Sequence, residues 1–233
     1  MARRDPEFKF SPEIREIKVW DLGVRFFHWA LVALVITSFV TAKIGGNAIT
    51  YHAWSGYGIL TLLTFRILWG IVGGTHARFA SFIKGPAACI AYLKIMFSRD
   101  RHGATLGHNA LGAMSVVAML AALLFQAVSG LFVNDDIAFE GPLYKWAGKE
   151  LSDKLMSLHK LNEKIIIALV LLHLAAIAFY FFYHRDNLVK PMFTGVKRVT
   201  GVVADSKFGN PLLALVLVAA CGTGVYFLIN AAR

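Results

Sequence analysis

The sequence predicts an all-α integral membrane protein, built as a four-helix bundle with a fifth transmembrane helix at its C-terminus. Hydrophobic residues make up 57% of the 233 residues and charged residues only 16%, against about 25% charged residues in a soluble domain. Five apolar stretches each approach the roughly 20 residues that a helix needs to cross the hydrocarbon layer of a membrane. So few charges cannot cover a water-exposed surface, which excludes a soluble enzyme and a disordered chain.

The five apolar stretches are expected to be transmembrane helices in chain order. The first is the shortest and resembles the apolar core of a signal peptide. The 25 residues before it are mostly polar and charged, and His28 and Trp29 stand near its start, so we interpret it as a span. The expected spans cover residues 26–42, 51–73, 111–133, 165–183 and 211–229.

Basic residues in the loops predict the orientation, because they collect on the cytoplasmic side of a membrane. Lysine and arginine are frequent before the first span, between spans two and three and after span four, whereas the turn at 44–50 has none. We therefore expect the N-terminus in the cytoplasm and the C-terminus outside. The chain then divides into a cytoplasmic N-terminal segment (1–25), a four-helix domain (26–183) and a cytoplasmic linker with the fifth helix (184–233).

The net charge of +10 would suggest nucleic acid in a soluble protein, but here topology accounts for it. The chain has no basic stripe interleaved with aromatic residues and no glycine-rich phosphate loop, which argues against a nucleic-acid partner. Cys89 and Cys221 form no disulfide framework, and the chain lacks the Cys-x-x-Cys-His segment that attaches a c-type haem. Residues 86–97 predict a short amphipathic helix on the inner membrane surface.

The placement of four histidines carries the chemistry, because ionisable residues within membrane helices are costly and usually functional. His159 and His173 are fourteen residues apart on one helix, so they share a face to within about 40° and lie about 21 Å apart along the axis. His28 begins the first span on the inner side, and His52 begins the second span on the outer side. The sequence therefore predicts an inner pair, His28 with His173, and an outer pair, His52 with His159.

Two histidines that face each other across a helix bundle are typical ligands of a metal. Zinc would usually need four nitrogen, sulfur or oxygen ligands, and no acid or thiol accompanies either pair. Haem iron needs only two axial ligands, and its flat apolar ring suits the core of a helical bundle. We therefore expect two haem b groups, with His28, His52, His159 and His173 as axial ligands of the haem iron.

Two arginines are candidates for binding haem propionates. Arg66 lies fourteen residues after His52 on the same face, at the depth of the inner pair, and no buried acid is apparent to pair with it. Arg25 stands one turn before His28, although simple snorkelling to the interface would explain it equally well. His28 lies about 15 Å shallower than His173 by helix rise, a gap that tilt or an earlier start of the first helix would close.

The other histidines fit the ligand role less well. His76 ends the second span and is the rival partner on the inner side, but it lies about 240° round the helix from His52. His102, His108 and His184 lie in or beside the inner loops, where solvated or headgroup-binding roles are expected.

Three segments resemble the prokaryotic cytochrome b561 family, which is related to the b-type cytochrome subunits of nickel–iron hydrogenases. They are VWDLGVRFFHW in the first span, YHAWSGYGILTLLTFRILWG in the second and SLHKLNEKIIIALVLLHLAAIAFY in the fourth. The resemblance covers residues 19–183 and not the fifth span. It implies four helices that hold two b haems through His28, His52, His159 and His173, and electron transfer between quinones and a second redox partner.

The leading hypothesis is therefore an electron-transfer protein of the bacterial inner membrane, an oxidoreductase if it is an enzyme. It would exchange electrons between the quinone pool and a periplasmic redox protein or small molecule. The loop at 134–158, with Asp135, Asp136 and Glu140 beside Phe139, Tyr144 and Trp146, is a candidate docking surface or a lid over the outer haem. The alternatives are a haem-carrying anchor subunit of a larger oxidoreductase, a homo-oligomer, and a transporter without haem.

Overall fold

The computed structural model describes residues 14–96, 107–137, 139–200 and 206–231. Most of these residues are helical, and five helices are long and apolar enough to cross a membrane. The predicted all-α membrane fold is thus confirmed, and the chain is a multi-pass membrane protein. The five long helices are α1 (Leu22–Ile44), α2 (Ile49–Val72), α5 (Ala110–Gly130), α6 (Tyr144–Phe182) and α8 (Pro211–Ala231).

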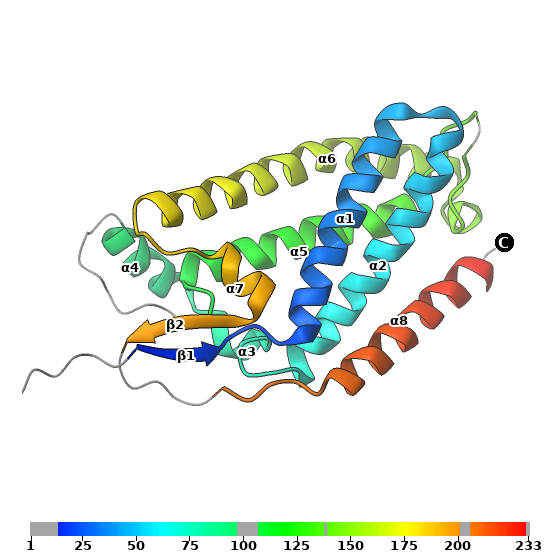
Figure 1. Cartoon of the computed structure of the whole chain (residues 1–233). Coiled ribbons are helices and arrows are strands. Elements are labelled where there is room, and N and C mark those ends of the chain that lie inside the picture. The colour runs from blue at the N-terminus through cyan, green and yellow to red at the C-terminus, as the bar shows by residue number, and fades with distance from the viewer. Residues whose placement is uncertain (1–13, 97–106, 138, 201–205, 232–233) are drawn as a thin grey trace, which may run out of the picture.

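Successive long helices run in opposite directions between two ends of the bundle (Figure 1). At one end, called here the loop end, η1 (Gly46–Ala48) joins α1 to α2, and residues 131–143 join α5 to α6. The other is called the sheet end. It holds the short elements β1 (Ile14–Lys18), α3 (Phe79–Phe82), α4 (Pro86–Met96), α7 (Val189–Thr194) and β2 (Val196–Thr200).

A small antiparallel sheet at the sheet end joins the two ends of the four-helix domain. β1 pairs with β2 so that Glu16 faces Arg198, and the two side chains form an ion pair at 2.8 Å. The backbone N–H of Val19 extends the pairing by donating to the carbonyl of Gly195 at 2.8 Å. The sequence predicted no strand here, because five-residue strands with so many charges lack a clear alternating pattern.

Asp21 holds the start of α1 against the end of α2. Its carboxylate caps α1 by accepting from the backbone N–H of Val24 at 2.9 Å. It also accepts from the indole N–H of Trp69 at 3.1 Å and from the backbone N–H of Gly74 at 3.2 Å. Asp21 is only 4% exposed, so these three donors satisfy a buried charge that would otherwise be costly. The contact fixes the register of the two helices that carry His28 and His52.

The apolar core lies between α1, α2 and α8, with α5 packed against it. Phe65 and Trp69 on α2 are fully buried in it. α6 is different, because Ser152 and Asn162 are the buried side chains that it contributes among the described residues. Polar groups connect α6 to α5. The Asn162 amide donates to the carbonyl of Ala122 at 2.9 Å and to Gln126 Oε1 at 2.8 Å.

Some boundaries differ from those predicted. α1 begins at Leu22, inside the segment expected to be an N-terminal extension, because Asp21 is a good helix cap. α6 begins at Tyr144, 21 residues before the predicted span at 165, and Gly148 (φ 70°) kinks it within its second turn. Most of the expected loop at 134–158 is therefore helical. The predicted helix at 86–97 is present as α4, and residues 1–13 and His102 lie outside the described residues.

Candidate functional site

The His52 and His159 side chains meet at the loop end of the bundle. Their ring centroids lie 6.3 Å apart, and the ring planes are nearly perpendicular at 77°. When two imidazoles bind one metal from opposite sides, each nitrogen lies about 2 Å from the metal and each ring centre about 1 Å further back, which separates the ring centres by about 6 Å. The spacing of this pair is therefore that of two axial ligands on one metal ion.

The hydrogen bonds of His52 determine which nitrogen is free to bind a metal. Its Nδ1 lies 2.8 Å from the backbone carbonyl oxygen of Ser38 and 3.1 Å from the Ser38 hydroxyl. A carbonyl oxygen only accepts, so His52 carries its proton on Nδ1. The lone pair is then on Nε2, which is how a histidine ligand is usually held by a second partner.

His159 has the same tautomer for a related reason. Its Nδ1 lies 2.9 Å from the hydroxyl of Ser129, and that hydroxyl donates its single hydrogen to the carbonyl of Gln126 at 3.1 Å. Ser129 therefore accepts from His159, which leaves Nε2 of His159 as the metal-binding nitrogen. A Cβ at Gly130 would lie 3.3 Å from the His159 ring, so this glycine allows the ring to pack close to α5.

His28 and His173, the predicted inner pair, lie nearer the sheet end. The two side chains are close enough to interact electrostatically. His28 packs edge-on against Trp29, with ring centroids 4.8 Å apart. Its Nδ1 is buried and has no hydrogen-bond partner among the described residues. The two pairs lie at different depths in the bundle. They also differ in their hydrogen bonds, because Nδ1 of His52 and of His159 has a partner and Nδ1 of His28 has none among the described residues.

Arg66 lies in the last third of α2 and is only 3% exposed. Its guanidinium stands over the ring of Phe79 at 4.8 Å and that of Phe27 at 6.0 Å. Its Nη1 has no hydrogen-bond partner in the described part of the chain. The sequence predicted that no buried acid lies near Arg66. That prediction was wrong, because the buried Asp21 is close enough to interact with the charge of the arginine. The Asp21 oxygens, however, accept from other donors.

Arg25 and His76 have other partners at the sheet end. The Arg25 guanidinium donates to the carbonyl of Phe193 and so connects α1 to α7, while its buried Nε has no partner among the described residues. His76 Nε2 lies 2.8 Å from the hydroxyl of Ser206. His76 therefore has a polar partner outside the helices that carry the four predicted ligands.

The residues that orient the histidines were missed in the sequence. Ser38, Ser129 and Gln126 are polar residues within apolar helices, and such residues commonly form hydrogen bonds between membrane helices. That signal was available, but it does not say which histidine each would contact. Asn162 was missed in the same way, although it lies one turn from His159 on the face that meets α5.

The donor set fits haem better than a bare metal ion. The described residues contain no group of three or more His, Cys, Asp or Glu side chains that could hold a metal. A pair of histidines suffices when a porphyrin supplies the remaining four ligands. The rings of His52 and His159 lie at a centroid spacing that suits such a pair, and the helices that carry them are apolar. These residues therefore fit an axially bound haem.

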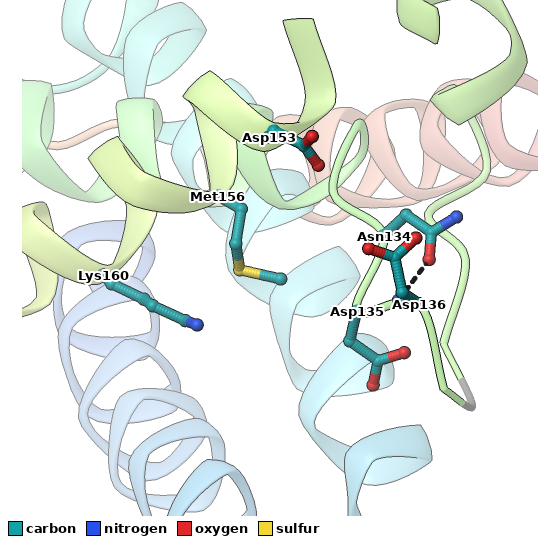
Figure 2. A pocket seen from close by; sticks show the side chains of 6 residues that line it. All are labelled: Asn134, Asp135, Asp136, Asp153, Met156 and Lys160. Atoms are coloured by element: carbon teal, nitrogen blue, oxygen red, sulfur yellow. Dashed lines mark hydrogen bonds between the residues drawn. The ribbon is translucent and has the colours of Figure 1, made fainter. Parts of the chain in front are cut away.

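A polar hollow of about 220 Å³ lies beside the loop end of α6. Figure 2 shows the side chains of the 134–136 turn on one side and those of α6 on the other. Lys149 pairs with Asp136 at 2.8 Å and with Asp153 at 3.6 Å, which neutralises part of the acidic charge. The lining residues of the hollow are Asn134, Asp135, Asp136, Asp153, Met156 and Lys160.

A comparison with known protein families identifies the family of the chain. The family model described as prokaryotic cytochrome b561 matches residues 19–195, which include both histidine pairs and end before α8. The searches found no matching curated protein and no matching solved structure. The chain therefore belongs to the prokaryotic cytochrome b561 family of membrane b-type cytochromes, which bind haem b and transfer electrons.

Proposed function

We propose that the protein carries two b haems and transfers electrons across a bacterial inner membrane, between quinone and a redox partner in the periplasm. The observation that carries the proposal is the pair of His52 and His159, with rings 6.3 Å apart and both Nδ1 atoms hydrogen-bonded. His28 and His173 would hold the inner haem, and His52 and His159 the outer haem. A bound haem supplies an iron centre that accepts and releases one electron.

The chain's own residues orient the ligands and balance charge. The Ser38 carbonyl and the Ser129 hydroxyl hold the rings of His52 and His159 in the metal-binding tautomer. Arg66 would bind a propionate of the inner haem, because a buried guanidinium requires a negative partner. Arg25 lies within one turn of His28 and could offer its Nε to the same haem.

The charge distribution supports an orientation with the sheet end in the cytoplasm. Arg15, Lys18, Lys197 and Arg198 lie on β1 and β2, and basic residues are typical of the cytoplasmic side. The N-terminus would then be cytoplasmic and the C-terminus periplasmic. Quinone would reach the protein through the lipid. The acidic hollow at the loop end would face the periplasm, where it could steer a basic redox protein.

The haem content of the purified protein tests the proposal. Pyridine haemochrome analysis should give two b haems per chain, whereas one or none would contradict it. His159→Ala should remove the outer haem and keep the inner one, and His173→Ala should do the reverse. His184→Ala is a matched control. His184 follows the end of α6, the helix that carries His159 and His173, but it bonds to the carbonyl of Met96. This variant should keep both haems.

A haem-carrying anchor subunit of a larger oxidoreductase is the second candidate. α8 lies outside the family match and packs against α2, where a Cβ added at Gly222 would lie 3.6 Å from the Thr61 methyl group. An additional helix of this kind could hold a partner subunit or a second copy in the membrane. Copurification from membranes separates this role from that of an independent electron carrier. A preparation without a b-type spectrum would instead favour a transporter.

A further inference from the structure

His108 lies at the sheet end, immediately before the Asn109 cap of α5, and it is not in the solvated position that the sequence suggested. Its ring stacks obliquely between Phe82, at 4.6 Å between centroids, and Trp20, at 4.8 Å. Its Nδ1 is shielded from solvent and has no hydrogen-bond partner among the described residues. A buried nitrogen without a partner costs about 1–3 kcal/mol, so this position calls for an explanation.

A second unpartnered group lies close by. Arg66 Nη1 is also buried without a partner in the described residues. Burial lowers the pKa of His108 to about 4, with smaller contributions from nearby Arg66, His76 and His173. In either protonation state the imidazole has an N–H to donate. His108 and Arg66, from separate elements, are therefore close enough to interact with each other and with the inner ligand His173.

The chemistry of the two groups indicates what they bind. A buried guanidinium needs a negative charge, and a neutral N–H beside it needs an acceptor, so a carboxylate satisfies both. Asp21 is the nearby acid, but its oxygens accept from Val24, Trp69 and Gly74. A quinone carbonyl would satisfy His108 but leave the charge of Arg66 unbalanced.

We propose that His108 and Arg66 together bind one carboxylate of the inner haem, with His108 donating from Nδ1. The proposal rests on the proposed function, since the carboxylate is a propionate of the haem between His28 and His173. His108 acts here as a positioning residue. It holds the propionate side of the ring at the sheet end, while the axial histidines hold the iron.

Two substitutions of His108 separate its hydrogen bond from its bulk. His108→Phe keeps an aromatic ring between Trp20 and Phe82 but removes the donor. His108→Asn places an amide N–H near the position of Nδ1 and should retain the bond. His184→Phe is the control, because it removes an inner-side histidine that bonds to the Met96 carbonyl.

The readout is a spectroelectrochemical titration of the full-length protein, with resonance Raman bands of the propionates. Losing a donor leaves more negative charge beside the iron. In His108→Phe, the ratio of reduced to oxidised inner haem at a fixed potential should fall about tenfold, which is about 59 mV for one electron. The propionate band should shift, the outer haem should be unchanged, and His108→Asn and His184→Phe should resemble the parent protein. Loss of the inner haem in His108→Phe, with retention in His108→Asn, would also support the proposal.

Several results would overturn it. An unchanged inner-haem titration and Raman spectrum in His108→Phe would mean that water, and not a carboxylate, bridges the two groups. Slower reduction by quinol at an unchanged potential would assign His108 to the quinone instead. Loss of the inner haem in both His108→Phe and His108→Asn would show a packing role. Absence of two haems in the parent protein would refute the proposed function itself, which is a separate outcome.

Discussion

Replacing Asp21 by alanine should destabilise the protein more than any change on its lipid-facing surface. The carboxylate caps α1 and accepts from the Trp69 indole and the Gly74 backbone N–H. Loss of a helix cap costs about 1 kcal/mol, and each donor left buried costs about 1–3 kcal/mol. Trp69 has 0% exposure, so its N–H cannot turn to water. We expect a total of at least about 3 kcal/mol.

Thermal unfolding in detergent, followed by tryptophan fluorescence and by the Soret band, measures this loss. For a chain of this length, each kcal/mol lowers the midpoint by about 2–4 °C, so Asp21→Ala should unfold roughly 10 °C lower. Asp21→Asn is the matched control, because asparagine caps helices as well as aspartate does and keeps one acceptor. It should lose about a third as much.

A second readout follows from position, because Asp21 lies seven residues before His28. The inner haem should be released at a lower temperature than the outer haem in Asp21→Ala. A midpoint within about 3 °C of the parent protein, equivalent to roughly 1 kcal/mol, would refute the reasoning. It would mean that water reaches Trp69 and Gly74 once the carboxylate is removed.

Three further predictions concern the outer haem. The His52 and His159 rings are crossed at 77°. The oxidised outer haem should therefore give one strongly anisotropic low-spin signal in electron paramagnetic resonance. A three-line rhombic spectrum would instead show parallel rings. Ser129→Ala removes one acceptor of the His159 N–H, the hydroxyl, and leaves the Gln126 carbonyl. This weakens the ligand as an electron donor and should raise the outer potential by up to about 40 mV, the equivalent of one hydrogen bond of about 1 kcal/mol. A fall in that potential would contradict the assigned tautomer. Glu140→Gln with Asp153→Asn should slow electron exchange with a basic partner at low salt and reduce its salt dependence. Asp135 is left intact because its carboxylate accepts from the backbone N–H groups of Ile137 and Phe139 and holds the loop. If the variant and the parent protein exchange electrons at equal rates at every salt concentration, the loop is a lid and not a docking surface.

The sequence predicted the features that depend on periodicity. The spans follow from apolar length, and the pairing of histidines follows from the fourteen-residue spacing of His159 and His173 together with the alternating direction of the helices. Neither requires knowledge of side-chain contacts. The start of α6 was not located by the search for apolar spans, because its first turns are polar and charged and do not contribute to an apolar window. Gly148 allows the change in direction by its positive φ.

Contacts between residues far apart in the chain could not be predicted from one sequence. The pairing of β1 with β2 joins segments about 180 residues apart, and no local pattern identifies such partners. The same holds for Asp21 and Trp69, which meet only after α1 and α2 have packed. His108 was assigned to a solvated loop because its neighbours in sequence are polar and glycine-rich. Its burial depends on Trp20 and Phe82, which come from other elements.

The two sites differ in ways that should set the direction of electron flow. Both outer ligands have Nδ1 hydrogen-bonded, which makes an imidazole a stronger electron donor and stabilises ferric iron. His28 of the inner pair has no such partner among the described residues, and the inner site adds the positive charge of Arg66. Both differences raise the inner potential relative to the outer one. Electrons should therefore pass favourably from the outer haem to the inner haem. In a redox titration, the component that His173→Ala removes should have the higher potential, and the reverse order would refute this assignment.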